Sequence, residues 1–75
     1  MSIYEEIGQT IVYLRKEKGL TQEKLTSETG ISVSYLRLIE HGNANPTINE
    51  LRKIAEVLDV ELQNPFYVIV QVGAV

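Results

Sequence analysis

The side chains best able to do chemistry lie between residues 20 and 42, and their chemistry is hydrogen bonding. Arg37 carries a planar fork of N–H donors that can bind two acceptors at once. The hydroxyl groups of Ser32 and Ser34 can donate or accept, and Tyr35 joins an apolar ring to a hydroxyl group. These residue types recognise a partner, and they do not by themselves make or break bonds.

Catalysis and metal binding find no support in the sequence. His41 is the one histidine and there is no cysteine. Serine, cysteine or carboxylate partners at the spacing that catalysis needs do not accompany His41, and a transition-metal site needs several such ligands. No glycine-rich phosphate loop is present. We therefore expect no enzyme activity, no metal and no cofactor, and we interpret His41 as a residue that favours the end of a helix dipole.

Two short helical patterns, joined by a glycine, position the polar residues. Thr21 and Ser32 are favourable N-caps for helices over residues 21–29 and 32–41. Gly30 lies between them, where a tight turn needs a positive φ. Three apolar residues face inward: Leu25, Leu36 and Ile39. The polar residues left to face outward are Gln22, Ser32, Ser34 and Arg37. This pattern is a helix-turn-helix, whose second helix is the one that enters a DNA groove.

The N-terminal part of that second helix reaches base edges in such a motif. Arg37 can bond a guanine edge in bidentate fashion, whereas the serines specify weakly because they can bond several bases. Val33 and Leu38 can contact a thymine methyl group, although Leu38 could equally be a packing residue or an exposed one. Tyr35 could reach a phosphate, or be a half-buried core tyrosine, or both. Five residues are therefore candidates for base contact: Ser32, Val33, Ser34, Arg37 and Leu38. For each of them the alternative is that the side chain only faces solvent.

Apolar periodicity predicts one helix before this motif and one after it. A stripe at spacings of 4, 4 and 3 indicates a helix over about residues 2–18: Ile3, Ile7, Ile11 and Leu14. Ser2 with Glu5, and later Thr47 with Glu50, have the spacing of capping boxes. The fourth helix should end near Asp59, with an apolar stripe of Ile48, Leu51, Ile54 or Ala55, and Leu58. Leucine and isoleucine from the four helices then form one core.

The same stretch carries a family resemblance. The matching positions are residues 14–22, then Leu25, Gly30, Ile31, Ser32, Ser34, Tyr35, Leu36, Ile39, Glu40 and Gly42, then Asn45, Pro46, Thr47, Leu51, Ile54, Ala55, Leu58 and Val60. In these residues the chain closely resembles the helix-turn-helix of Cro and the lambda repressor, also called the XRE family. The resemblance covers roughly residues 7–62. Thr26 departs from it, because the family has a small alanine there, and the extra hydroxyl must find a backbone carbonyl one turn back.

The resemblance implies a sequence-specific DNA-binding regulator of transcription, most simply a repressor, of bacterial, phage or mobile-element origin. It implies that Gln22 touches a phosphate and helps to hold the recognition helix, where the alternative is an ordinary exposed glutamine. It implies phosphate contacts for Asn43 and Asn45, whose alternative is turn chemistry. It also implies a buried ion pair between Arg15 and Glu40.

The last residues follow another pattern. Asn64-Pro65 limits a fifth helix to about one turn, and the aromatic and β-branched run over residues 66–72 prefers an extended strand. We therefore expect an all-α, compact four- to five-helix lambda-repressor-like domain over residues 1–64 and a β segment within residues 65–75. That segment is the predicted homodimer interface, with the alternative that it folds back on its own domain: Phe66, Tyr67, Val68, Ile69, Val70 and Val72.

Length, charge and composition limit the kinds of partner that the chain can have. Seventy-five residues allow one small domain, which a dimer interface would supplement. The net charge of −3 argues mildly against nucleic acid, although the basic residues gather around the motif. We expect double-stranded DNA as the partner; the alternative is a protein-interaction module of the same fold, such as an antitoxin or a partner of another repressor. The absence of cysteine suits the cytoplasm, and no apolar run is long enough for a membrane span or a signal peptide.

Overall fold

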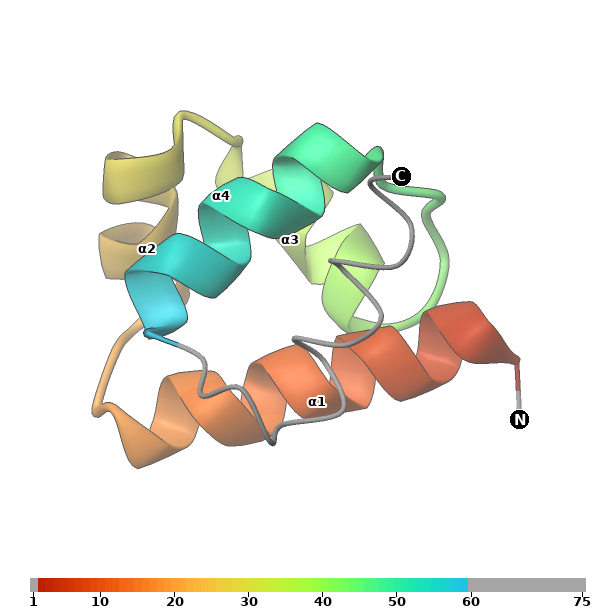
Figure 1. Cartoon of the computed structure of the whole chain (residues 1–75), viewed down its shortest axis with the longest axis horizontal. Coiled ribbons are helices and arrows are strands. Elements are labelled where there is room, and N and C mark those ends of the chain that lie inside the picture. The colour runs from red at the N-terminus through yellow and green to blue at the C-terminus, as the bar shows by residue number, and fades with distance from the viewer. Residues whose placement is uncertain (1, 60–75) are drawn as a thin grey trace.

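Four helices follow one another along the chain (Figure 1). They are α1 (Ile3–Glu17), α2 (Gln22–Thr29), α3 (Val33–Glu40) and α4 (Ile48–Leu58). This computed structural model describes residues 2–59. Within that range the all-α prediction is confirmed. A fifth helix, the strand predicted over residues 66–72 and the dimer interface assigned to it lie outside the described residues.

Each helix begins at a hydroxyl side chain that the sequence marks as an N-cap. Ser2 and Thr47 each accept a hydrogen bond from the backbone N–H three residues later, and the glutamate at that position bonds back to complete a capping box. Thr21 and Ser32 accept in the same way from Lys24 and Tyr35. These predictions are confirmed, because capping depends only on residues within one turn of each other.

The turn between α2 and α3 is made by Gly30, whose φ of 77° is left-handed. A residue with a Cβ adopts this conformation only at a cost, which is why a glycine is needed there. Ile31 follows and packs partly buried against the core. The turn therefore fixes the angle at which α3 leaves α2.

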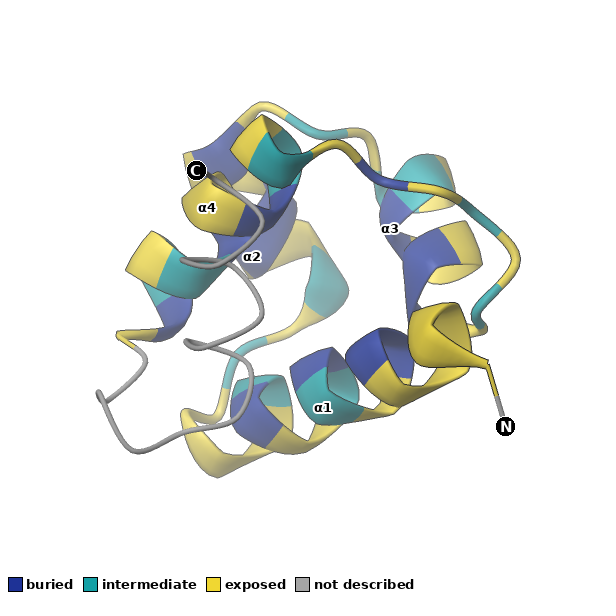
Figure 2. Cartoon of the chain, turned by 45° about the vertical axis from the view of Figure 1, so that its right-hand side comes forward, coloured by how far each residue is buried: buried dark blue, intermediate teal, exposed yellow. Residues whose placement is uncertain are grey.

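Within residues 2–59 the core is one cluster, to which all four helices contribute. Its members are Ile7, Ile11, Leu14, Leu25, Leu36, Ile39, Leu51, Ile54 and Leu58. Figure 2 shows the buried stretches of α1 and α3 on the sides of these helices that face the middle of the molecule. Ile3 is a correction to the predicted stripe: it lies in the first turn of α1 and is 46% exposed. The spacing of apolar residues shows which face of a helix is buried, but it does not show how far the neighbouring helices extend along that face. At Ile3 no neighbouring helix covers the side chain.

Buried Thr26 shows how a polar residue is accommodated in close helix packing. Its hydroxyl donates to the backbone carbonyl of Gln22, at 2.9 Å, as expected from its departure from the family pattern. The carbonyl of Glu23 lies at 3.0 Å from the same oxygen. The hydroxyl is therefore satisfied within its own helix, so its burial leaves no unpaired donor.

Helix α1 touches the C-terminal end of α3 through Gly8. A Cβ built at Gly8 would overlap the carbonyl oxygen of Ile39 and lie 2.6 Å from that of Glu40. One turn earlier, Glu5 meets the backbone of Gly42, where an added Cβ would lie 2.6 Å from the Glu5 Cγ. These contacts set the end of α3 directly on the surface of α1. The position of α3 thus depends on backbone-to-backbone contact that only glycine permits.

Candidate nucleic-acid interface

Helix α3 has one face in the core and one face in solvent. Leu36, Ile39 and Glu40 are buried. Ser34, Arg37 and Leu38 are exposed, and Leu38 is 48% exposed to solvent. Residues three and four apart lie on the same side of a helix, so these three candidates share one face. The structure therefore brings together the residues that the sequence assigns to base contact.

The N-terminal end of α3 carries the remaining base-contact candidates. Ser32 is exposed, and its hydroxyl oxygen accepts from the backbone N–H of Tyr35 at 3.1 Å. Its own hydrogen is still able to donate, because a capping hydroxyl only accepts. Val33 is half-buried, which leaves part of its side chain for contact. The first turn of α3 holds no acidic residue, so the positive end of this helix dipole is not neutralised by its own side chains.

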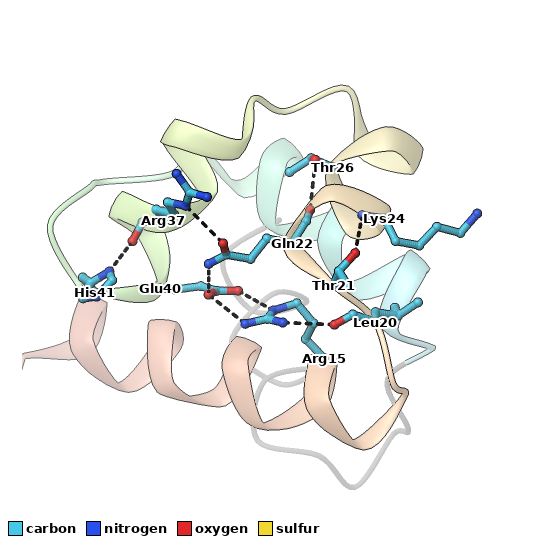
Figure 3. Close-up of polar contacts among 9 residues, drawn as sticks. All are labelled: Arg15, Leu20, Thr21, Gln22, Lys24, Thr26, Arg37, Glu40 and His41. Carbon is cyan, nitrogen blue, oxygen red and sulfur yellow. Dashed lines mark hydrogen bonds and ion pairs between the residues drawn. The ribbon is translucent and has the colours of Figure 1, made fainter.

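Arg37 is bound to α2 across the turn. Its Nε donates to the Oε1 of Gln22 at 3.1 Å (Figure 3). Its Nη2 lies 4.0 Å from the Oε1 of Glu23. The side chain is still 58% exposed. The guanidinium therefore has one N–H held by the protein while most of its donors face outward.

The predicted ion pair between Arg15 and Glu40 is confirmed. Arg15 donates from Nε to Oε2 of Glu40 at 2.8 Å and from Nη2 to Oε1 at 3.2 Å. The two side chains are only 12% and 3% exposed. Arg15 also donates from Nη1 to the backbone carbonyl of Leu20 at 3.0 Å. The pair ties α1 to the end of α3 and to the loop that leads into α2.

Gln22 lies between this ion pair and Arg37. Its Nε2 donates to Oε1 of Glu40 at 2.9 Å while its Oε1 accepts from Arg37. Gln22 is half-buried, so the expectation that it simply faces outward is wrong: its amide is bonded on both sides. A continuous chain of hydrogen bonds therefore runs from Arg15 through Glu40 and Gln22 to Arg37 (Figure 3).

Tyr35 is a half-buried residue whose ring packs against the core. Its hydroxyl donates to Oε1 of Glu50 in α4 at 2.9 Å. Burial and, secondarily, this bond raise the pKa of Tyr35 above its ordinary value. The backbone N–H of Thr47, 2.7 Å away, is the main cause that lowers the pKa of Glu50. Tyr35 thus joins α3 to α4, and it would have to turn its hydrogen away from Glu50 to bond a phosphate.

The loop after α3 holds the two asparagines. The backbone N–H of Asn43 donates to the carbonyl of Leu38 at 2.8 Å, and that of Gly42 donates to Ile39 at 3.0 Å, which together close the helix in a Schellman motif. Asn43 and Asn45 are exposed. Turn chemistry is therefore observed for the backbone of Asn43, while both side chains are accessible to a phosphate.

Two contributors to the site gave no signal in the sequence. Glu23 places a carboxylate near Arg37, although the two residues are separated by the whole turn. Gly8 allows the approach of α1 to α3, although a glycine inside a helix is otherwise only a weak helix former. Both depend on which elements meet in space. A spacing rule within one helix could not have found them.

Residues 2–59 contain no group of three or more histidine, aspartate or glutamate side chains placed to hold a metal ion. None of α1 to α4 is long and apolar enough to cross a membrane.

Known proteins resemble this chain in sequence. The family model for the helix-turn-helix matches residues 11–63. The HTH-type transcriptional regulator y4dJ of Sinorhizobium fredii is 40% identical over 60 residues, which cover 80% of this chain and 78% of y4dJ. The HTH-type transcriptional regulator SinR of Bacillus subtilis is 44% identical over 57 residues, covering 75% of this chain but only 51% of SinR.

A solved structure agrees with these matches. The crystal structure of the restriction-modification controller protein C.AhdI from Aeromonas hydrophila superposes with a TM-score of 0.74 at 36% identity. The superposition covers 77% of this chain and 88% of the controller protein. Sequence and structure therefore point to the same family.

Proposed function

The chain belongs to the helix-turn-helix family of DNA-binding transcriptional regulators, of the Cro and lambda-repressor (XRE) type, and is not an enzyme; we propose that it is a repressor that binds a palindromic operator as a homodimer. Residues 1–64 form the DNA-binding domain and residues 65–75 the dimerisation segment. As a repressor of bacterial or phage genes it acts in the cytoplasm.

The observation that carries this proposal is the exposed face of α3. Ser34, Arg37 and Leu38 project from it, while the opposite face is fixed in the core by Leu36 and Ile39. A helix held in this way can be laid into the major groove, which is wide enough to admit it. Direct base contact then falls to Ser32, Val33, Ser34, Arg37 and Leu38.

Backbone contacts position the helix over the bases. Gln22 begins α2, where free backbone N–H groups suit a phosphate oxygen. Asn43 and Asn45 are exposed after α3 and can bond the next phosphates along the strand. Tyr35 contributes through its hydroxyl only if the bond to Glu50 is exchanged. These contacts fix register without specifying sequence.

The homodimer is proposed to form through residues 66–72. An apolar run with unpaired strand edges favours pairing with another strand, and antiparallel pairing with the same segment of a second copy satisfies both edges about a two-fold axis. The pairing residues would be Phe66, Tyr67, Val68, Ile69, Val70 and Val72. Such a dimer would hold its two recognition helices about 34–36 Å apart, one turn of DNA.

Selection of duplexes from a random-sequence library by the full chain tests the proposal. A palindromic DNA-binding dimer should enrich two inverted half-sites about one helical turn apart, and binding to the enriched duplex should weaken steeply as salt is raised. If no duplex is enriched at low salt, the protein is better explained as an interaction module of the same fold.

The same duplex allows the dimer interface to be tested with a chain that stops after Asn64. The shortened chain retains all nine buried apolar residues of the core that the structure describes within residues 2–59. It should sediment as a monomer in analytical ultracentrifugation and lose most of its affinity for the palindromic duplex. A shortened chain that remains dimeric would place the interface elsewhere, with α4 as the next candidate.

A further inference from the structure

We infer that Gln22 is a positioning residue for base recognition: it holds the guanidinium of Arg37 in place and connects it to the buried Arg15–Glu40 pair. This inference rests on the proposed function of Arg37 as the residue that recognises a guanine. It assigns Gln22 a role in sequence discrimination, in addition to any contact with a phosphate.

The chain of contacts begins at a rigid anchor. Arg15 and Glu40 meet through two bonds, at 2.8 and 3.2 Å, and both side chains are almost fully buried. Bidentate arginine–carboxylate pairs have a narrow geometry. The Oε1 atom of Glu40 is thereby fixed relative to α1 and α3, and it is the atom that accepts from Gln22 at 2.9 Å.

The orientation of the Gln22 amide follows from its two neighbours. A carboxylate only accepts hydrogen bonds and a guanidinium only donates them. The amide nitrogen must therefore face Glu40, and the amide oxygen is left to face Arg37, which is the arrangement seen in Figure 3. A flipped amide would lose both bonds at once, so the ion pair dictates where the acceptor for Arg37 lies.

The bond to Gln22 changes what Arg37 brings to DNA. An exposed arginine samples many rotamers and loses that freedom on binding. Gln22 accepts from Nε at 3.1 Å, which restricts the side chain before DNA arrives. The amino groups Nη1 and Nη2 keep their donors for an acceptor pair such as O6 and N7 of guanine. Arg37 is therefore preorganised, and its two terminal amino groups remain available to a DNA base.

Gln22 keeps enough hydrogen-bonding capacity for both roles. Its amide can donate two hydrogen bonds and accept two, and the structure uses one of each. The second N–H can still bond a phosphate. A phosphate contact alone would weaken all DNA sequences alike, whereas a positioning role also lowers the preference for guanine at the base pair that Arg37 recognises.

The first test is made on the free protein. In the full-length chain labelled with ¹⁵N, the Nε–H of Arg37 should give a dispersed NMR signal with slowed solvent exchange. Gln22→Met keeps the length of the side chain but removes its amide, and Gln22→Ala serves as a second variant. Both should move the Arg37 signal to the position of a free arginine and speed its exchange. An Arg37 signal unchanged in the folded Gln22 variants would overturn the inference.

Glu23→Gln is the matched control. Glu23 is also near Arg37, but its carboxylate is 4.0 Å from Nη2 and 68% exposed, so this contact is expected to contribute little. The substitution should leave the Arg37 Nε–H signal in place. A loss of that signal in Glu23→Gln instead would assign the positioning to Glu23 and contradict the role of Gln22.

The second test measures discrimination on the duplex selected by the wild-type chain and on the same duplex with one guanine pair replaced. Gln22→Met should reduce the ratio of the two affinities by about 2- to 10-fold, as loss of one modest hydrogen bond would. In an Arg37→Ala background it should no longer change that ratio. If Gln22→Met weakened binding to both duplexes equally, Gln22 would make only a phosphate contact and the positioning role would be wrong. If Arg37→Ala itself leaves the ratio unchanged, base recognition by Arg37 fails, while the NMR result decides the contact with Gln22 separately.

Discussion

Replacing Glu40 with alanine should lower the free energy of unfolding by about 3–5 kcal/mol, the cost of breaking a buried ion pair by removing one partner. Arg15, whose side chain is 12% exposed, would keep its charge without the carboxylate that receives two of its donors. The amide of Gln22 would lose its acceptor as well. Such a loss is a large part of the stability of a small domain. Urea denaturation followed by circular dichroism measures it.

Two variants show whether the loss comes from the pair. Glu17→Ala removes an exposed glutamate from α1 and should change stability by no more than about 0.5 kcal/mol. The double variant Arg15→Met with Glu40→Leu removes both charges and should be less destabilised than Glu40→Ala alone, because no unpaired charge remains. An unfolding midpoint for Glu40→Ala equal to that of the wild type would show that the pair contributes nothing.

Gly8→Ala should destabilise the fold by about 1–3 kcal/mol through overpacking. The added methyl group would overlap the carbonyl oxygen of Ile39 and approach that of Glu40 to 2.6 Å, and neither backbone atom can move without shifting the end of α3. Helix propensity alone predicts the opposite sign, a gain of roughly 0.5–1 kcal/mol for alanine over glycine inside a helix. The sign of the change in thermal unfolding therefore distinguishes the two effects.

The exposed neighbour Gln9 provides the comparison for Gly8. Gln9→Ala changes the same helix at a position that faces solvent and should alter stability by less than about 0.5 kcal/mol. If Gly8→Ala were instead more stable than the wild type, the close approach of α1 to α3 would be wrong.

The helix boundaries could be predicted from the sequence because their causes are local. Ser2, Thr21, Ser32 and Thr47 each cap the backbone N–H three residues ahead, and such bonds need no information about the rest of the fold. Gly30 is predictable for the same reason, since a left-handed turn favours glycine wherever it occurs. The core stripes followed from helical period, except at Ile3, which is exposed, and at Ile48, which is only half-buried, because exposure depends on which elements lie opposite.

The polar contacts of the site could be predicted only in part. The pairing of Arg15 with Glu40 came from the family resemblance, not from spacing, because the residues are 25 positions apart. The two hydrogen bonds of the Gln22 amide could not be foreseen, since they require the start of α2 to meet both Glu40 and Arg37 of α3. The close contact of Gly8 with the end of α3 could not be predicted for the same reason. Contacts between elements depend on helix placement to within an ångström, and periodicity does not supply that.

Base recognition by Arg37 can be tested by comparing Arg37→Ala with the wild type on two duplexes at one fixed salt concentration. One duplex is the sequence selected by the wild-type chain and the other has the same composition in scrambled order. Fluorescence anisotropy should show that the substitution weakens binding to the selected duplex by about 1–3 kcal/mol, the discrimination conferred by a bidentate guanine contact. Affinity for the scrambled duplex should change little. Equal losses on both duplexes would show that Arg37 only neutralises phosphate charge and that α3 does not recognise bases through it.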